Sequence, residues 1–280
     1  MQLDCRGYAL ALDAPVVMGV LNVTPDSFSD GGLHASADDA VAHGRRMAEE
    51  GAAIIDVGGE STRPGAPAID TKEELARVIP VIEALARAVA VPISVDTSKP
   101  AVMRAAAAAG ARIINDVRAL RAPGALEAAA ATRAAVCLMH MQGEPGDMQA
   151  DPRYEDVVAE VQGFLAGRVE ACVAAGIPRE RLCIDPGIGF GKRAEHNLAL
   201  LRNLGVLTRG GRPVLIGVSR KALIGIITGR GTGDRLAGSV ALAALCAERG
   251  VAIVRAHDVA ATVDAVKTGA ALRGAALQRS

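Results

Sequence analysis

The sequence of 280 residues contains no tryptophan, and its few rings bring the aromatic share to only 2%. Apolar residues nevertheless make up 50%, so a large core must be built from alanine, valine, leucine and isoleucine. The formal net charge is zero and no basic run occurs, which makes nucleic acid and anionic membranes poor candidate partners. No uncharged apolar stretch approaches the ~20 residues that span a bilayer.

Signals for secretion and for disulfides are also missing. The segment Met1–Cys5 lacks the basic and then apolar parts of a signal peptide. The five cysteines form no C-x-x-C pair, so a zinc site or a catalytic thiol has no support from spacing. Cys137 and Cys183 fall inside predicted strands, and we expect small buried thiols in a reducing compartment, the cytoplasm.

Eight short apolar segments recur along the chain, and nearly every one runs into polar residues. Such regular alternation of strands and helices predicts an α/β fold, a single-domain (β/α)₈ TIM barrel over residues 1–280, close to the ~250 residues typical of one barrel. An open doubly wound sheet is the alternative, but it usually has about five or six strands. The predicted strands are Val17–Leu21, Ile54–Val57, Ile93–Val95, Ile113–Ile114, Val136–Met139, Leu182–Ile184, Val214–Val218 and Ile253–Val254.

Residues 1–14 alternate between apolar and polar around Arg6-Gly7, which predicts a β-hairpin that covers the N-terminal end of the barrel. Thr71-Lys72-Glu73-Glu74 is typical of a capping box, and Asp258 of a helix N-cap. The connections 22–35 and 58–70 are long, as functional loops of compact barrels often are. The predicted helices are Ser36–Glu50, Thr71–Ala88, Pro100–Ala109, Pro152–Ala175, Gly233–Arg249 and Asp258–Leu272.

The polar segments after the strands occur in the order of a known family. In a barrel they all meet at one face. They are residues 22–32 (NVTPDSFSDGG), 56–65 (DVGGESTRPG), 94–97 (SVDT), 114–117 (INDV), 138–143 (LMHMQG), 185–192 (DPGIGFGK), 219–221 (SRK) and 255–258 (RAHD). Together, from about Val17 to Asp258, the chain resembles the dihydropteroate synthases.

The resemblance implies an enzyme that joins 6-hydroxymethyl-7,8-dihydropterin diphosphate to p-aminobenzoate, with release of pyrophosphate and formation of 7,8-dihydropteroate. This is the folate-pathway step that sulfonamides block. The family also forms homodimers, and the alanine-rich helix Leu236–Ala247 has enough apolar residues for an interface, although packing onto the barrel explains it equally well.

A pterin is flat and has a guanidine-like edge, whose two adjacent N–H groups suit a bidentate carboxylate. Asp185 is the candidate for that role. By resemblance, Asp96 and Asn115 bind the remaining polar atoms of the ring. Lys221 would donate to the ring carbonyl or the neighbouring nitrogen, and Met139 and Phe190 would pack on the ring faces.

Arg255 and His257 stand on alternate positions of one strand, so both can face one anion, and this end of a barrel often binds phosphate. Thr62 can add a hydroxyl and a backbone N–H to the diphosphate. In the family, the residue matching Asn22 helps to hold Mg²⁺, which commonly binds through few protein ligands plus phosphates and water.

Catalysis is expected to be dissociative, because the electron-rich pterin can stabilise a cation at the reacting carbon. Asp96, and Asp30 from the first long loop, would stabilise that cation. The resemblance implies a pocket for aminobenzoate made by Phe28, Arg63 and Pro64. Backbone N–H groups after Ser219 would anchor the aminobenzoate carboxylate.

Two other functions compete with this interpretation. A corrinoid-linked methyltetrahydrofolate methyltransferase has a related pterin-binding barrel but needs no diphosphate site, so Thr62-Arg63-Pro64 and the pair Arg255 and His257 favour the synthase. A noncatalytic pterin-binding relative should have lost loop residues that are present here. Residues 187–192 lack P-loop spacing, and no G-x-S-x-G element occurs, so covalent catalysis has no support.

Overall fold

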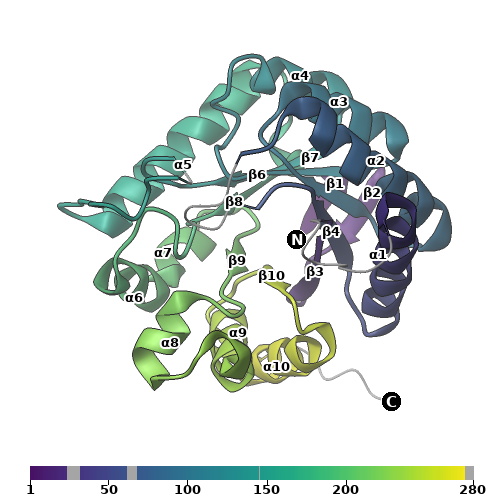
Figure 1. Cartoon of the computed structure of the whole chain (residues 1–280). Coiled ribbons are helices and arrows are strands. Elements are labelled where there is room, and N and C mark those ends of the chain that lie inside the picture. The colour runs from purple at the N-terminus through teal and green to yellow at the C-terminus, as the bar shows by residue number, and fades with distance from the viewer. Residues whose placement is uncertain (24–31, 62–67, 145, 275–280) are drawn as a thin grey trace.

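The computed structural model describes residues 1–23, 32–61, 68–144 and 146–274, and Figure 1 shows a barrel of strands enclosed by helices. Eight parallel strands follow the order β8-β7-β6-β5-β4-β3-β10-β9, and a parallel bridge between Ile184 and Val214 closes the ring. The (β/α)₈ prediction is therefore confirmed. The strands are β3 (Val16–Asn22), β4 (Ile54–Gly58), β5 (Ile93–Asp96), β6 (Ile113–Asp116), β7 (Ala135–Met139), β8 (Leu182–Asp185), β9 (Leu215–Gly217) and β10 (Ile253–Ala256).

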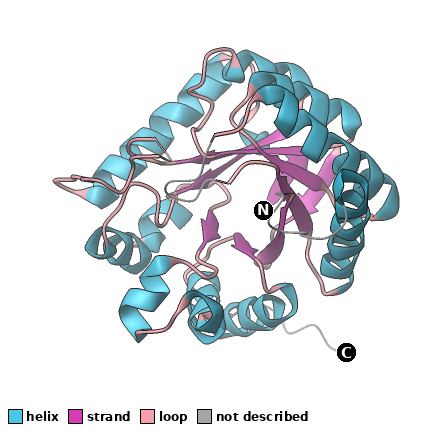
Figure 2. Ribbon diagram, viewed as in Figure 1, coloured by secondary structure: helices cyan, strands magenta, loops and turns pink. Residues whose placement is uncertain are grey.

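Helices cover the outside of the barrel (Figure 2). They are α1 (Gly32–Glu49), α2 (Thr71–Ala88), α3 (Pro100–Ala109), α4 (Ala125–Thr132), α5 (Val157–Ala174), α6 (Ala194–Arg202), α7 (Leu204–Thr208), α8 (Ala222–Thr228), α9 (Leu236–Glu248) and α10 (Val259–Leu272), with short 3₁₀ turns η2 (Arg179–Arg181) and η3 (Thr232–Asp234). Among the described helices, none has the length and apolar character to cross a membrane.

The predicted bounds of α2 and α3 are confirmed, whereas several other predicted helix ends were wrong, and a side-chain cap explains one of these errors. α5 begins at Val157 rather than Pro152, because the Asp156 carboxylate accepts the N–H groups of the first turn. α2 is capped by Asp70, whose Oδ1 accepts from Glu73 N at 2.7 Å, and not by a box at Thr71. α9 begins at Leu236, after a separate 3₁₀ turn.

Asp258 precedes α10 but its side chain does not cap the helix. Its carboxylate instead accepts two hydrogen bonds from the Arg220 guanidinium, at 3.0 and 2.5 Å. Two charge-assisted hydrogen bonds to a guanidinium are stronger than the single bond that a cap would provide, so the Asp258 carboxylate pairs with Arg220. For the short helices α4, α6, α7 and α8 no bounds were predicted, because few turns give little periodic signal.

The N-terminal hairpin closes one end of the barrel. β1 (Gln2–Cys5) pairs antiparallel with β2 (Tyr8–Ala11), and Arg6 and Gly7 both adopt the left-handed backbone that two-residue hairpin turns require. Its apolar side chains pack in one cluster with residues from the beginnings of the barrel strands: Leu3, Cys5, Leu10 and Leu12 with Met18, Ile54, Ile113, Leu215 and Ile253. The predicted cover of the N-terminal end is thus confirmed. All five cysteines are free and buried.

Candidate active site

Period-two alternation along the strands directs alternate side chains into the barrel, and the inward residues at the strand ends lie at its carboxyl end. Four positions form one row across adjacent strands: Asn22 pairs with Gly58, Gly58 with Asp96, and Asp96 with Asn115. Gly58 leaves a gap in this row. A Cβ built there would lie 3.8 Å from both Asn22 Oδ1 and Asp96 Oδ2, so these two oxygens border the same space.

Arg255 is held between two carboxylates. Its Nε donates to Asp56 Oδ2 at 2.6 Å and its Nη2 to Asp96 Oδ2 at 2.8 Å. Burial lowers the pKa of Arg255, but the two aspartates outweigh this effect and raise it. Burial also raises the pKa of Asp96 to about 7, against the opposing charge of Arg255.

Asp56 is a site residue that the sequence analysis missed. It is fully buried, and its Oδ2 also accepts from Asn115 Nδ2 at 3.0 Å. This bond fixes the Asn115 amide so that its oxygen is turned away from Asp56. The signal was available, because Asp56 follows Ile54 by two positions on β4 and so must share its inward face. The predicted site residues stand mostly at or after strand ends, whereas Asp56 lies in mid-strand.

Asp185, at the end of β8, stands at a tight turn. Its Oδ1 accepts from Gly187 N at 2.7 Å. Burial raises the pKa of Asp185, and the Lys221 charge is the largest of the effects that oppose the rise. Burial also lowers the pKa of Lys221 to about 8. Lys221 Nζ donates to the Ile188 carbonyl and lies 4.4 Å from the centre of the Phe190 ring, so the three predicted residues Asp185, Phe190 and Lys221 are brought together.

An apolar patch adjoins these polar groups. Met139 pairs in register with Asp185 and is buried with Val117, Met141 and Met148, and Phe190 packs against them. Sulfur and ring surface beside carboxylates suits a flat heterocycle that has polar edges.

His257 and Ser219 are neighbours at the ends of the last two strands. His257 Nδ1 lies 3.0 Å from Ser219 Oγ, and the same hydroxyl accepts from His257 N at 3.2 Å. The structure thus places Arg255 towards the interior carboxylates and His257 beside Ser219. The predicted site residues Phe28, Asp30, Thr62, Arg63 and Pro64 lie outside the described part of the chain.

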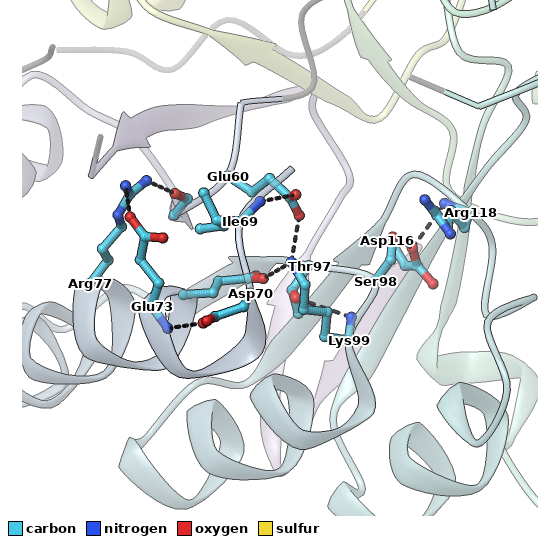
Figure 3. A network of polar contacts seen from close by, with 12 residues as sticks. Glu60, Ile69, Asp70, Glu73, Arg77, Thr97, Ser98, Lys99, Asp116 and Arg118 are labelled. Atoms are coloured by element: carbon cyan, nitrogen blue, oxygen red, sulfur yellow. Dashed lines mark hydrogen bonds and ion pairs between the residues drawn. The ribbon is translucent and has the colours of Figure 1, made fainter. Parts of the chain in front are cut away.

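The ends of the connection between β4 and α2 are joined by a network of charged groups (Figure 3). Glu60 Oε1 accepts from Ile69 N at 3.1 Å, which ties the start of the connection to its end. Lys99 Nζ contacts Glu60 at 2.7 Å and Glu74 at 2.5 Å. Arg77 adds a bond to the Gly59 carbonyl at 2.8 Å. These contacts therefore hold together the two ends of the connection between β4 and α2.

Replacing Lys99 with methionine is expected to lower the free energy of unfolding by about 3 kcal/mol, because it leaves the fully buried Glu74 carboxylate without its cation. Urea denaturation measures this. Arg179→Met is the control, since its pair with Glu170 is exposed and should be worth less than about 1 kcal/mol. Equal losses in the two variants would show that the Lys99 contacts do not persist in solution.

Acceptor oxygens, a lysine and an apolar patch thus gather at the carboxyl end of the barrel, a combination of groups that suits a flat heterocycle with polar edges. A sequence model of one family, described as "Pterin binding enzyme", matches residues 18–257. The match spans the barrel from β3 to the residues after β10.

Similar proteins agree with that class. The dihydropteroate synthase of Escherichia coli K12 is 54% identical over 267 residues, which cover 95% of each chain. The Yersinia pestis enzyme, solved with a sulfonamide drug, has a TM-score of 0.93 at 51% identity and covers 98% of this chain and 100% of that chain.

The Xanthomonas albilineans synthase was solved with 4-aminobenzoic acid (TM-score 0.91, 58% identity, 98% of each chain). It was also solved with 7,8-dihydropteroate (TM-score 0.88, 54% identity, 98% of this chain and 99% of that chain). The chain therefore belongs to the pterin-binding enzymes and, within them, to the dihydropteroate synthases, which are transferases.

Proposed function

We propose that this chain condenses 6-hydroxymethyl-7,8-dihydropterin diphosphate with p-aminobenzoate to give 7,8-dihydropteroate and pyrophosphate. The observation that supports this most is the grouping of Asp96, Asn115, Asp185 and Lys221 beside Met139 and Phe190. Asp185 accepts the two N–H groups of the pterin edge, and Asn115, with its amide fixed by Asp56, offers its oxygen to the ring. The alternative, a corrinoid-linked methyltetrahydrofolate methyltransferase, would not need Arg255 and His257 to bind a diphosphate.

The proposed reaction is SN1-like. The carbon–oxygen bond to the diphosphate breaks first, and the cation left on the pterin methylene is then attacked by the neutral aromatic amine. Asp96, and Asp30 beyond the described residues, stabilise the cation. Arg255 and His257, with Thr62, stabilise the leaving diphosphate. No strong general base is needed, because an aniline nitrogen attacks unprotonated, and the acidic N-alkylated anilinium that forms then loses one proton to water.

The aminobenzoate pocket is assigned to Phe28, Arg63 and Pro64, with the backbone after Ser219 as the anchor for its carboxylate. Positional isotope exchange in the pterin diphosphate, measured without aminobenzoate, tests the order of these events. Scrambling of the bridging oxygen supports bond cleavage before attack. Its absence would count against a free cation.

The residues present also fit Mg²⁺. Among the described residues, no group of three or more His, Cys, Asp or Glu side chains could hold a metal, so an all-protein cage is not available there. The amide oxygen of Asn22 and the carboxylate of Asp96 border the space above Gly58. Mg²⁺ prefers such oxygen ligands together with substrate phosphates and water. Bound there, it would neutralise charge on the diphosphate.

We expect removal of Mg²⁺ by chelation to reduce turnover at least about tenfold, and readdition to restore it. In an Asn22→Ala variant, the Mg²⁺ concentration for half-maximal rate should rise several-fold. Asn203→Ala is the control, because that asparagine only donates to the Ala199 carbonyl on α6. A Mg²⁺ dependence that is the same in Asn22→Ala and wild type would remove Asn22 from the metal site.

Pyrophosphate release from the pterin diphosphate, measured with Mg²⁺ and with or without p-aminobenzoate, tests the function itself. Equal amounts of aminobenzoate-dependent pyrophosphate and dihydropteroate are expected. Retained pterin binding without product would favour the methyltransferase or a noncatalytic role.

A homodimer is also proposed. Large apolar side chains are exposed on two adjoining helices, Ile226 and Ile227 on α8 and Leu236 and Leu245 on α9. Exposed apolar surface of this kind often marks an interface. Analytical ultracentrifugation of the full chain gives the oligomeric state directly, and a monomer at micromolar concentration would contradict the proposal.

A further inference from the structure

Lys192 is a buried lysine that the proposed reaction leaves unused. We propose that Lys192 is a positioning residue of the pterin subsite: its ammonium group fixes the turn Gly187–Phe190 behind Asp185 and supports the Asp185 carboxylate from within the protein. This inference rests on the proposed function, since it concerns the subsite for that substrate.

The ammonium group of Lys192 is enclosed by acceptors. Its Nζ lies 3.0 Å from the Gly187 carbonyl, 2.9 Å from the Phe190 carbonyl and 3.3 Å from the His140 carbonyl. His140 Nδ1 is 2.9 Å away. Burial and the Lys192 charge lower the pKa of His140 to about 3, so its imidazole is neutral and can accept a hydrogen bond. The three N–H groups of one ammonium thus serve four acceptors on two loops.

This arrangement is costly. Lys192 is only 3% exposed, and its Nζ has three carbonyl oxygens and an imidazole nitrogen as partners rather than a carboxylate of the described residues. Burial lowers its pKa to about 7. An apolar side chain of similar length would avoid the desolvation of a charge. A group that costs stability and lies against a binding site is more readily explained by function than by folding.

The turn needs such a tie because two stretches of backbone meet there. Gly187 and Gly191 both have a left-handed backbone, and a Cβ on either would fall within 2.0 Å of the His140 carbonyl oxygen or 2.2 Å of the Gln142 carbonyl oxygen. The carbonyl groups of His140 and Gly187 both point at Lys192 Nζ. Two such dipoles directed at one point repel each other, and a positive charge between them removes that repulsion.

The turn Gly187–Phe190 also positions the protein groups that are proposed to contact the pterin. Gly187 N donates to Asp185 Oδ1, and the turn ends at Phe190, whose ring lies under Lys221. The charges of Lys221, Lys192 and Arg255 and the Gly187 N–H all oppose the burial that raises the pKa of Asp185. Loss of Lys192 would therefore loosen the turn and make the ionised form of the Asp185 carboxylate less stable.

Titration calorimetry with 6-hydroxymethyl-7,8-dihydropterin diphosphate and Mg²⁺, without aminobenzoate, tests the inference. Lys192→Met should raise the Kd at least tenfold, while the KM for aminobenzoate at saturating pterin diphosphate changes less than threefold. Lys192→Gln removes the charge but keeps two N–H donors, so a smaller rise in Kd is expected. Arg249→Met is the matched control, a cation that donates to the Leu201 carbonyl at the other end of the barrel, and should bind as wild type does.

The outcomes distinguish a failure of the proposed function from a failure of the role proposed for Lys192. If the wild-type protein does not bind the pterin diphosphate, the proposed function fails. If wild type binds and Lys192→Met binds within twofold, the positioning role is wrong. Should Lys192→Met not fold, as judged by its thermal melting, Lys192→Gln decides by the same criterion. An equal rise in Kd in Arg249→Met would show general loosening and would also overturn the inference.

Discussion

Replacement of Arg255 by methionine is expected to lower the free energy of unfolding by about 3–5 kcal/mol and to abolish measurable synthase activity. The stability loss arises because Asp56 is fully buried and its carboxylate loses the guanidinium 2.6 Å away. Asp96 loses its partner in the same substitution. Urea denaturation at pH 7.5 and the kcat/KM for the pterin diphosphate measure the two effects.

A double variant distinguishes the causes. Asp56→Asn with Arg255→Met removes the orphaned charge, so most of the lost stability should return, while activity stays absent because the diphosphate still lacks the Arg255 guanidinium. The neutral amide introduced by the first substitution can still accept from Asn115. If the single Arg255→Met variant unfolds within about 1 kcal/mol of wild type, by the scale of a surface pair, the buried contact with Asp56 is not maintained in solution.

Asp185→Asn is expected to reduce kcat/KM for the pterin diphosphate by about 10²–10⁴-fold, because two charge-assisted bonds worth about 1.5–3 kcal/mol each are lost. The introduced amide also presents N–H groups where the pterin edge presents its own. The Gly187 N–H keeps an acceptor in the variant. We therefore expect activity to fall without a matching loss of stability.

The pH dependence gives this prediction a second readout. Burial raises the pKa of Asp185 above its usual value of 3.8, so between the unfolded and folded pKa values the folded state binds more protons. The contribution of this group to the free energy of unfolding therefore falls as pH rises between those two values. Asp185→Asn should remove this fall. Asp4→Asn is the opposite control: Arg181 lowers the pKa of Asp4, and that contribution to stability is lost as pH falls. An unchanged kcat/KM in Asp185→Asn would remove Asp185 from the pterin subsite.

Sequence pattern was most informative where a signal is local. Strand positions follow from short apolar runs, and the hairpin from alternation around Arg6-Gly7, because both depend on nearest neighbours along the chain. Helix ends were less predictable. Asp258 has the chemistry of a cap, but a distant arginine, Arg220, takes its carboxylate.

Some residues of the candidate site could be predicted from local sequence signals, and others could not. Asp96, Asn115, Asp185, Lys221 and Arg255 follow or end strands, so the barrel topology alone predicts that they meet at one face. Asp56 and Lys192 were missed as site residues. Their roles depend on what lies opposite them across the barrel or on the next loop: Arg255 and Asn115 for Asp56, and the His140 and Gly187 carbonyls for Lys192.

The barrel, the order of its strands and the set of polar residues at its carboxyl end follow from the chain alone, because strand period and strand order are properties of the sequence. How those residues share their charges depends on contacts that form only in the folded protein. Arg255 lies between Asp56 and Asp96, and Lys192 lies among carbonyl groups without a carboxylate partner in the described chain. Burial sets the free energy of each charge, and burial arises only when the strands and loops close around it.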